Sequence, residues 1–166
     1  LADVEYVLTE TEQNRVENGK VRWFGIDVGE KRIFWKKLTV KGVAEHASEP
    51  TGHNPVPRLA RIITRLDAWQ TPLRVIPAVD RYFKSQAGYE TGEGRRWLAD
   101  AAKALRSPRG RAWLLRDSER NALLRNTISA TVLVGSDKTN SIPGEASVEL
   151  DIRLLPDEDT VAFRRE

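Results

Sequence analysis

Apolar and polar residues alternate most regularly in two stretches of the C-terminal half of the chain. In residues 146–154 every second side chain is apolar, and those between them are polar or charged. Successive side chains of a strand point to opposite faces of a sheet, so this pattern predicts a strand with one buried and one wet face. Residues 128–134 predict a second strand, and residues 135–137 (Gly-Ser-Asp) predict a turn after it.

A second region of alternation lies near the N-terminal end. Phe24, Ile26 and Val28 alternate with other residue types, and residues 33–40 are rich in aromatic and branched side chains. The Gly-Glu-Lys sequence at 29–31 has turn chemistry, so residues 21–40 predict a β-hairpin. The polar residues 9–20 before it predict a connector and a domain boundary.

Helical patterns fill the middle of the chain. Asn54 followed by a proline predicts a helix start, and apolar residues at helical spacing then predict a helix over residues 55–68. Further apolar periodicity predicts a helical insertion over about residues 84–125, interrupted near Pro108. Residues 156–159 (Pro-Asp-Glu-Asp) predict another helix start with acidic residues in its first turn.

This order of elements predicts an α+β fold, in which helices pack on one face of a largely antiparallel sheet. We expect residues 1–20 to be the end of a strand and connector of a preceding domain. Residues 21–166 then form one domain that carries the insertion.

Composition narrows the classes of protein. With 166 residues, 40% of them hydrophobic, the chain can form one domain with its own core, and no apolar run could span a bilayer. The chain contains no Met and starts at Leu1, which indicates a piece of a longer protein. We identify no signal peptide, which favours a soluble cytoplasmic protein over an exported one.

Two residue counts restrict the chemistry. Because the chain has no Cys, thiolate zinc sites and cysteine nucleophiles are excluded. His46 and His53 are the only two histidines, so no site here has three imidazole ligands. The net charge of +3 is spread along the chain, with no basic run interleaved with aromatics, which argues against nucleic-acid and membrane partners.

Two separated motifs resemble a known family. The first comprises Gly-Glu-Lys at 29–31 and GVAEHASEP at 42–50, with the Asn54 helix start behind it; the second comprises KTNSIPGEA at 138–146 and LDIRLLP at 150–156. In order, spacing and residue type these segments resemble the dimerisation (lid) domain of zinc metallopeptidase family twenty. That family includes aminoacylase, carboxypeptidases G and S, acetylornithine deacetylase and succinyl-diaminopimelate desuccinylase.

The resemblance implies a ferredoxin-like lid with a four-stranded, mainly antiparallel sheet and helices on one face. It also implies a homodimer that pairs through the lid, and a separate catalytic domain that holds two zinc ions. The parent protein would cleave peptide or N-acyl amino acid amide bonds. We expect this chain alone to bind no zinc and to be inactive.

The resemblance also assigns roles to single residues. His46 would reach across the dimer into the partner's cleft and stabilise the oxyanion of the tetrahedral intermediate. Asn140 and Arg153 would bind substrate, the arginine as a fork for a carboxylate. Glu10 would be the last metal-binding carboxylate before the lid, and the neighbouring Glu12 competes for that assignment.

Several alternatives stay open at this point. Arg153 could form only a surface ion pair with Asp151 or Glu149, which contributes little to stability. Glu45 and Arg32 stand where the family usually has glycine, and a side chain there imposes strain if the backbone needs a positive φ. As whole-protein alternatives we consider a non-enzymatic α+β interaction module, such as one that binds nucleic acid, and a family member that has lost its metals.

Overall fold

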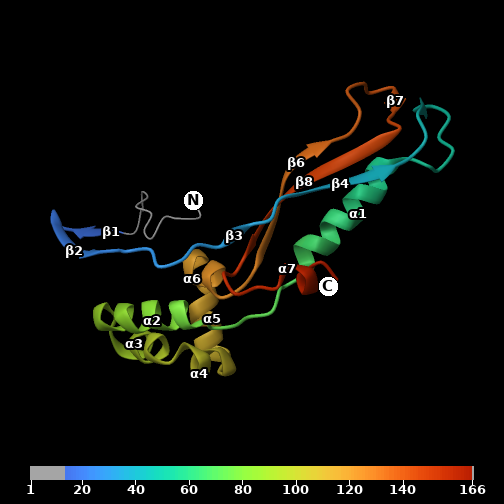
Figure 1. Ribbon diagram of the computed structural model, residues 1–166. Coiled ribbons are helices and arrows are strands. Elements are labelled where there is room, and N and C mark those ends of the chain that lie inside the picture. The colour runs from blue at the N-terminus through green and yellow to red at the C-terminus, as the bar shows by residue number, and fades with distance from the viewer. Residues whose placement is uncertain (1–13, 166) are drawn as a thin grey trace, which may run out of the picture. The chain divides into compact units, whose positions relative to one another are not determined.

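The computed structural model describes residues 14–165. The chain divides after Glu30 into two compact units, later than the boundary at residue 20 that the sequence predicts. The first unit contains a hairpin, and the second contains all the remaining helices and strands (Figure 1).

The hairpin of the first unit joins β1 (Asn14–Glu17) to β2 (Lys20–Phe24). Its two-residue turn has Asn18 at φ 51° and Gly19 at φ 72°. Asn-Gly is the residue pair that favours such a turn, because both central positions need a positive φ. The predicted hairpin over residues 21–40 is therefore wrong, since β2 pairs with β1 and not with the strand that follows it.

The second unit alternates short strands with helices. Its elements are β3 (Arg32–Ile33), β4 (Lys36–Lys41), β5 (Glu45–His46), α1 (Pro55–Ala68), α2 (Pro77–Gln86), the 3₁₀ turn η1 (Ala87–Tyr89), α3 (Gly92–Ala99), α4 (Ala101–Arg106), α5 (Pro108–Arg116), α6 (Ser118–Leu123), β6 (Thr127–Val134), β7 (Ser141–Ile142), β8 (Glu145–Leu154) and α7 (Thr160–Phe163).

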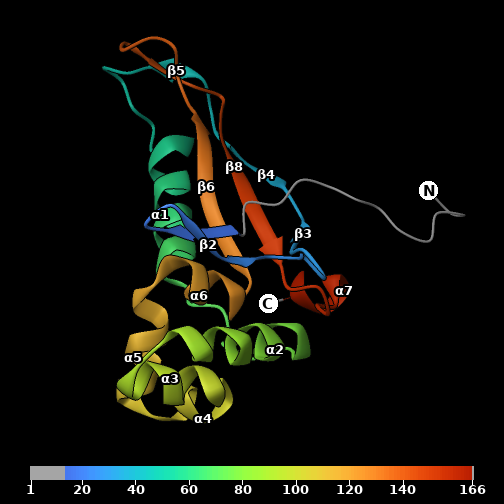
Figure 2. The ribbon, with the colours of Figure 1, turned by 90° about the vertical axis from the view of Figure 1, so that its left-hand side faces the viewer.

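The central strand of the main sheet is β8, and all its pairings are antiparallel. β6 pairs with one edge of β8. On the other edge, β4 pairs with the first part of β8 and β3 pairs with its last two residues. A second, two-stranded sheet pairs β5 with β7. Figure 2 shows β5 at the opposite end of the main sheet from helices α2–α5. The α+β fold with a four-stranded antiparallel sheet is confirmed.

The α1 helix covers one face of the sheet, as predicted, over the predicted residues. The side chain of Asn54 caps it by accepting a hydrogen bond from the backbone N–H of Val56 at 2.9 Å. Its inner residue Leu59 is 1% exposed and packs on Val148, Leu150 and the other apolar residues of β8. The opposite face, which we call the open face, carries the polar residues of the β8 alternation.

Helices α2–α6 form the insertion and have a core of their own. Phe83, Leu98, Leu114 and Leu124 are buried together, and Leu155 at the end of β8 joins them. The insertion starts at Pro77, before the predicted residue 84. Trp97 and Trp113, apolar residues of the predicted pattern, pack against each other, with ring centroids 5.5 Å apart.

One glycine fixes how α4 meets α5. A Cβ on Gly110 would lie 2.6 Å from the backbone oxygen of Ala104, so a larger residue would push the two helices apart. The break near Pro108 is confirmed as the start of α5, which the Ser107 side chain caps.

A polar network joins the two segments that flank the insertion to the segment that follows β8. The Thr71 hydroxyl donates to the Asn126 carbonyl at 2.6 Å, and the Asn126 side chain accepts from the Leu155 backbone N–H at 2.8 Å. Arg74 pairs with Asp157 and Glu158 at 2.8 and 2.7 Å. Two of the acidic residues predicted to start a helix therefore bind Arg74, in the segment before the insertion, and the helix begins only at Thr160.

Within residues 14–165 no helix is both long and apolar enough to cross a bilayer.

Candidate functional site

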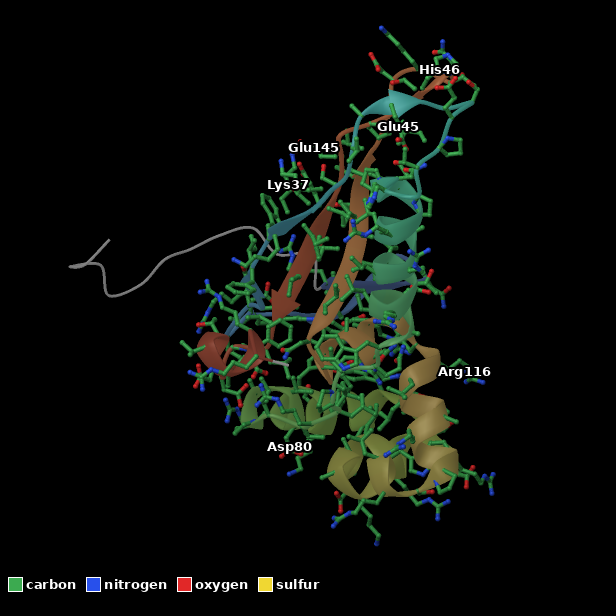
Figure 3. All side chains as sticks on the ribbon, turned by 90° about the vertical axis from the view of Figure 1, so that its right-hand side faces the viewer. Lys37, Glu45, His46, Asp80, Arg116 and Glu145 are labelled. Carbon is green, nitrogen blue, oxygen red and sulfur yellow. The ribbon has the colours of Figure 1, made fainter. Side chains whose placement is uncertain are left out.

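The small β5–β7 sheet forms one end of the unit and holds two of the predicted site residues together. His46 pairs with Ser141, and Asn140 immediately precedes that residue. The backbone N–H of Ala47 donates to the Asn140 carbonyl at 3.0 Å, which holds Asn140 beside the histidine. The side chains of both His46 and Asn140 are exposed, and Figure 3 shows His46 at the extremity of this end, above Glu45.

Ser48 orients the His46 imidazole. The ring Nδ1 lies 2.7 Å from the Ser48 hydroxyl and accepts the Ser48 backbone N–H at 3.2 Å. A ring nitrogen that accepts a backbone N–H uses its lone pair, so the neutral ring carries its proton on Nε2. His46 therefore has an Nε2–H donor on an exposed side chain.

Glu45 has its own partners. Its carboxylate accepts hydrogen bonds from the Thr51 hydroxyl at 2.6 Å and from the Thr51 backbone N–H at 3.0 Å. The hydroxyl bond, and after it the backbone bond, hold the pKa of Glu45 below its ordinary value. Glu45 thus braces the loop between β5 and α1.

The backbone is not strained at the two positions where the resembled family usually has glycine. Glu45 and Arg32 both lie in paired strands. Among the described residues, Asn18 is the only non-glycine residue with a positive φ. The backbone at these two positions therefore needs no glycine.

Arg153 lies near the other end of β8 and is held by an ion pair. Its Nε and Nη2 donate to the two carboxylate oxygens of Asp151 at 2.6 and 3.0 Å. These hydrogen bonds lower the pKa of Asp151 and raise that of Arg153. The surface ion pair that the sequence left open as an alternative is therefore present, on the open face of the sheet.

The length of β8 separates Arg153 from His46. From Glu145, beside the β5–β7 sheet, to Arg153 the strand extends roughly 26 Å at about 3.3 Å per residue. The structure thus brings His46 and Asn140 together, but places Arg153 far from both of them within one chain.

The predicted metal ligand Glu10, and its competitor Glu12, lie outside the described residues. Residues 14–165 contain no group of three or more His, Asp or Glu side chains that could hold a metal ion. The donor set that zinc needs is therefore not met by this part of the chain.

Comparisons with known proteins relate this fold to a protein family. The family model described as the peptidase dimerisation domain of family M20 matches residues 28–166. The chain belongs to this family. The comparison with curated proteins gave no match.

Three solved structures resemble the M20 dimerisation domain described above. Human carnosine dipeptidase 1 is 16% identical with a TM-score of 0.48, and the match covers 85% of this chain and 34% of that one. The M20 family metallo-carboxypeptidase Sso-CP2 from Sulfolobus solfataricus is 18% identical with a TM-score of 0.49, and the match covers 82% of this chain and 33% of that one. The di-peptidase Dug1p from Saccharomyces cerevisiae is 14% identical with a TM-score of 0.40, and the match covers 82% of this chain and 32% of that one. The chain spans about a third of the length of the solved structures it matches.

Sequence reasoning missed Lys31 of this M20 domain, which is half-buried next to Arg153. Its ammonium group donates to the carbonyls of Ala122 and Arg125 at 3.1 and 3.0 Å and to the Thr127 hydroxyl at 2.8 Å. Burial, and then the nearby charge of Arg153, lower the pKa of Lys31 to about 8. The motif Gly-Glu-Lys gave no signal for this role, because turn chemistry predicted an exposed lysine.

The buried Lys31 predicts that stability rises with pH. Because its pKa is lower in the folded than in the unfolded domain, the unfolded state binds more protons between about pH 8 and 10.5. The free energy of unfolding should therefore increase across this window by on the order of 2 kcal/mol relative to Lys31→Met, which lacks the titrating group. Urea unfolding of both proteins at pH 7.5 and 10 checks this. Equal changes in the two proteins would contradict it.

Proposed function

We propose that this chain is the lid and dimerisation domain of a zinc-dependent hydrolase of peptide or N-acyl amino acid amide bonds. His46 acts in catalysis, and Asn140 and Arg153 bind substrate. Membership of the M20 family supports the proposal. The zinc ions, two by resemblance, bind residues outside those described, because the described residues lack a donor set for them.

The observation that carries the proposal is the separation of His46 from Arg153 along β8. A dipeptide or an N-acyl amino acid extends only about 7 Å, whereas β8 extends roughly 26 Å from Glu145, beside the sheet that carries His46, to Arg153. One lid therefore cannot apply both groups to one substrate. In a twofold dimer, each cleft receives Arg153 from its own lid and His46 from the partner's lid.

The geometry of His46 suits an oxyanion donor. Its side chain is exposed, and Ser48 fixes the ring through Nδ1. Attack on an amide carbonyl builds negative charge on the carbonyl oxygen, and a preoriented donor stabilises that charge without reorganising. Asn140 lies beside His46 and would enter the same cleft, where its amide binds the polar groups of the substrate.

Arg153 supplies the fork for a substrate carboxylate. In the structure Asp151 occupies that fork with two hydrogen bonds. Both groups are exposed enough for exchange with a ligand, since the side chain of Arg153 is 40% exposed. A substrate carboxylate would replace or share the Asp151 contacts.

The outer edge of β6 supports a homodimer through this domain. Among the described strands β6 pairs only with β8, and its sequence TISATVLV contains no charge or proline. Its Val132, Leu133 and Val134 are exposed. The outer edge of β4 instead carries three lysines, which protect an edge against pairing. The β6 edge, with α1 beside it (Figure 2), is therefore the surface that pairs with a second lid.

The His46 proposal predicts a specific loss of catalysis. In the full-length enzyme, His46→Ala should lower kcat by about 10²–10³-fold with little change in KM, because an oxyanion donor acts in the transition state. His53→Ala, which removes another exposed histidine, should leave kcat within about twofold. Steady-state kinetics of the two variants checks this. Equal effects of both substitutions would overturn the assignment.

The dimer proposal predicts that a charge on the β6 edge separates the subunits. Leu133 is 67% exposed, so Leu133→Asp should leave the fold intact but weaken dimerisation at least about tenfold, since a carboxylate would be desolvated in the interface. Tyr89→Asp, at an exposed position of the insertion, is the matched control and should stay dimeric. Light scattering over a concentration series measures both. A Leu133→Asp protein that dimerises like the control would exclude this edge.

A further inference from the structure

The open face of the sheet has a hollow next to Arg153 that the proposed function leaves without a role. The hollow has a volume of about 340 Å³, and its lining includes Trp35, Lys37, Thr131, Glu149 and Asp151. That volume lies in the range of sites that hold small molecules. Asp151 connects the two features, because it lines the hollow and also binds Arg153.

Trp35 stands at the wall of this hollow with most of its ring in water. It is 63% exposed, although an indole is a side chain that proteins usually bury. Trp35 and Asp151 both line the hollow, and the indole N–H, after the guanidinium of Arg153, helps to lower the pKa of Asp151. Trp35 is therefore an exposed apolar surface on the same hollow as the carboxylate that binds Arg153.

A β-bulge shapes the opposite wall. The register of β6 against β8 shifts between Ala130 and Val132, which leaves Thr131 as the extra residue. The Thr131 hydroxyl donates to the backbone oxygen of Glu149 at 3.3 Å. A bulge bends its strand and redirects side chains, and bulges are common next to binding sites. The hollow is thus formed by the backbone of the sheet.

The charges around the hollow favour a neutral occupant. Lys37 and Glu149 are direct cross-strand partners of opposite charge, and Asp151 is already neutralised by Arg153. Lys36, which also lines the hollow, has its ammonium group over the Phe34 ring, 3.9 Å from the ring centroid. A flat apolar side chain would cover the exposed face of the indole.

Resting on the proposed function, in which Arg153 binds the substrate carboxylate, we propose that this hollow binds the side chain of the same substrate residue. Trp35 is then a specificity-determining residue that favours an aromatic side chain next to the free carboxylate. Asp151 is a positioning residue, which holds the guanidinium beside the hollow that it lines.

The test compares aromatic with small substrates in the full-length enzyme. Probes are the dipeptides Ala-Phe and Ala-Ala and the pair N-acetyl-phenylalanine and N-acetyl-alanine. The wild type should prefer the phenylalanine member of the pair it hydrolyses by at least about tenfold in kcat/KM. Trp35→Ala should remove most of this preference, mainly by raising KM for the aromatic substrate, while Trp35→Phe should keep it within about threefold. Tyr89→Ala, another exposed aromatic residue, is the control and should change nothing.

The outcomes separate this inference from the proposed function. An enzyme that hydrolyses these probes but keeps its preference in Trp35→Ala, or loses rate on both members equally, overturns the subsite alone. A wild-type enzyme that hydrolyses them without preferring phenylalanine does the same. A wild type that hydrolyses none of the probes overturns the proposed function and the subsite with it.

Discussion

The structure depends on the burial of one face of β8. Its apolar residues Val148, Leu150 and Ile152 pack under α1 and exclude water, which stabilises the sheet through the hydrophobic effect. The residues between them are left for the open face, where Asp151 and Arg153 pair. The same strand thus supplies the core and the candidate substrate groups, and its ten residues set the distance between the two ends of the domain.

Because of that distance, we assign different roles to the two ends of the domain. The end with β5 and β7 presents His46 and Asn140 on a small sheet. A short loop and the hydrogen bond between Thr51 and Glu45 hold this sheet in place. The other end is held to α6 and to the segment after it, through Lys31 and the buried Asn126. A rigid base and an exposed tip suit a lid that holds substrate at its base and extends its tip into a neighbouring subunit, which is the arrangement we propose.

Local patterns were sufficient to predict α1 and β8, because a capping Asn54 and a strict alternation each act within a few residues. They fail for the hairpin, because Asn18 and Gly19 lie inside a polar segment, and because the Gly-Glu-Lys sequence at 29–31 predicts a turn although the strands on its two sides do not pair with each other. They could not place Arg153 relative to His46, since that requires the long-range pairing of β5 with β7 and the register of β8. The Asp151–Arg153 pair could be anticipated from their spacing on one face; the burial of Lys31 could not.

The central claim is that His46 and Arg153 of one chain serve different clefts. The most direct measurement uses full-length heterodimers in which one subunit carries His46→Ala and the other Arg153→Ala, each substitution being inactive in its homodimer. If each cleft takes its arginine from its own lid and its histidine from the partner, one of the two clefts in the heterodimer is intact, and the purified heterodimer should recover about half of the wild-type activity. A heterodimer that stays as inactive as the two homodimers would contradict the account.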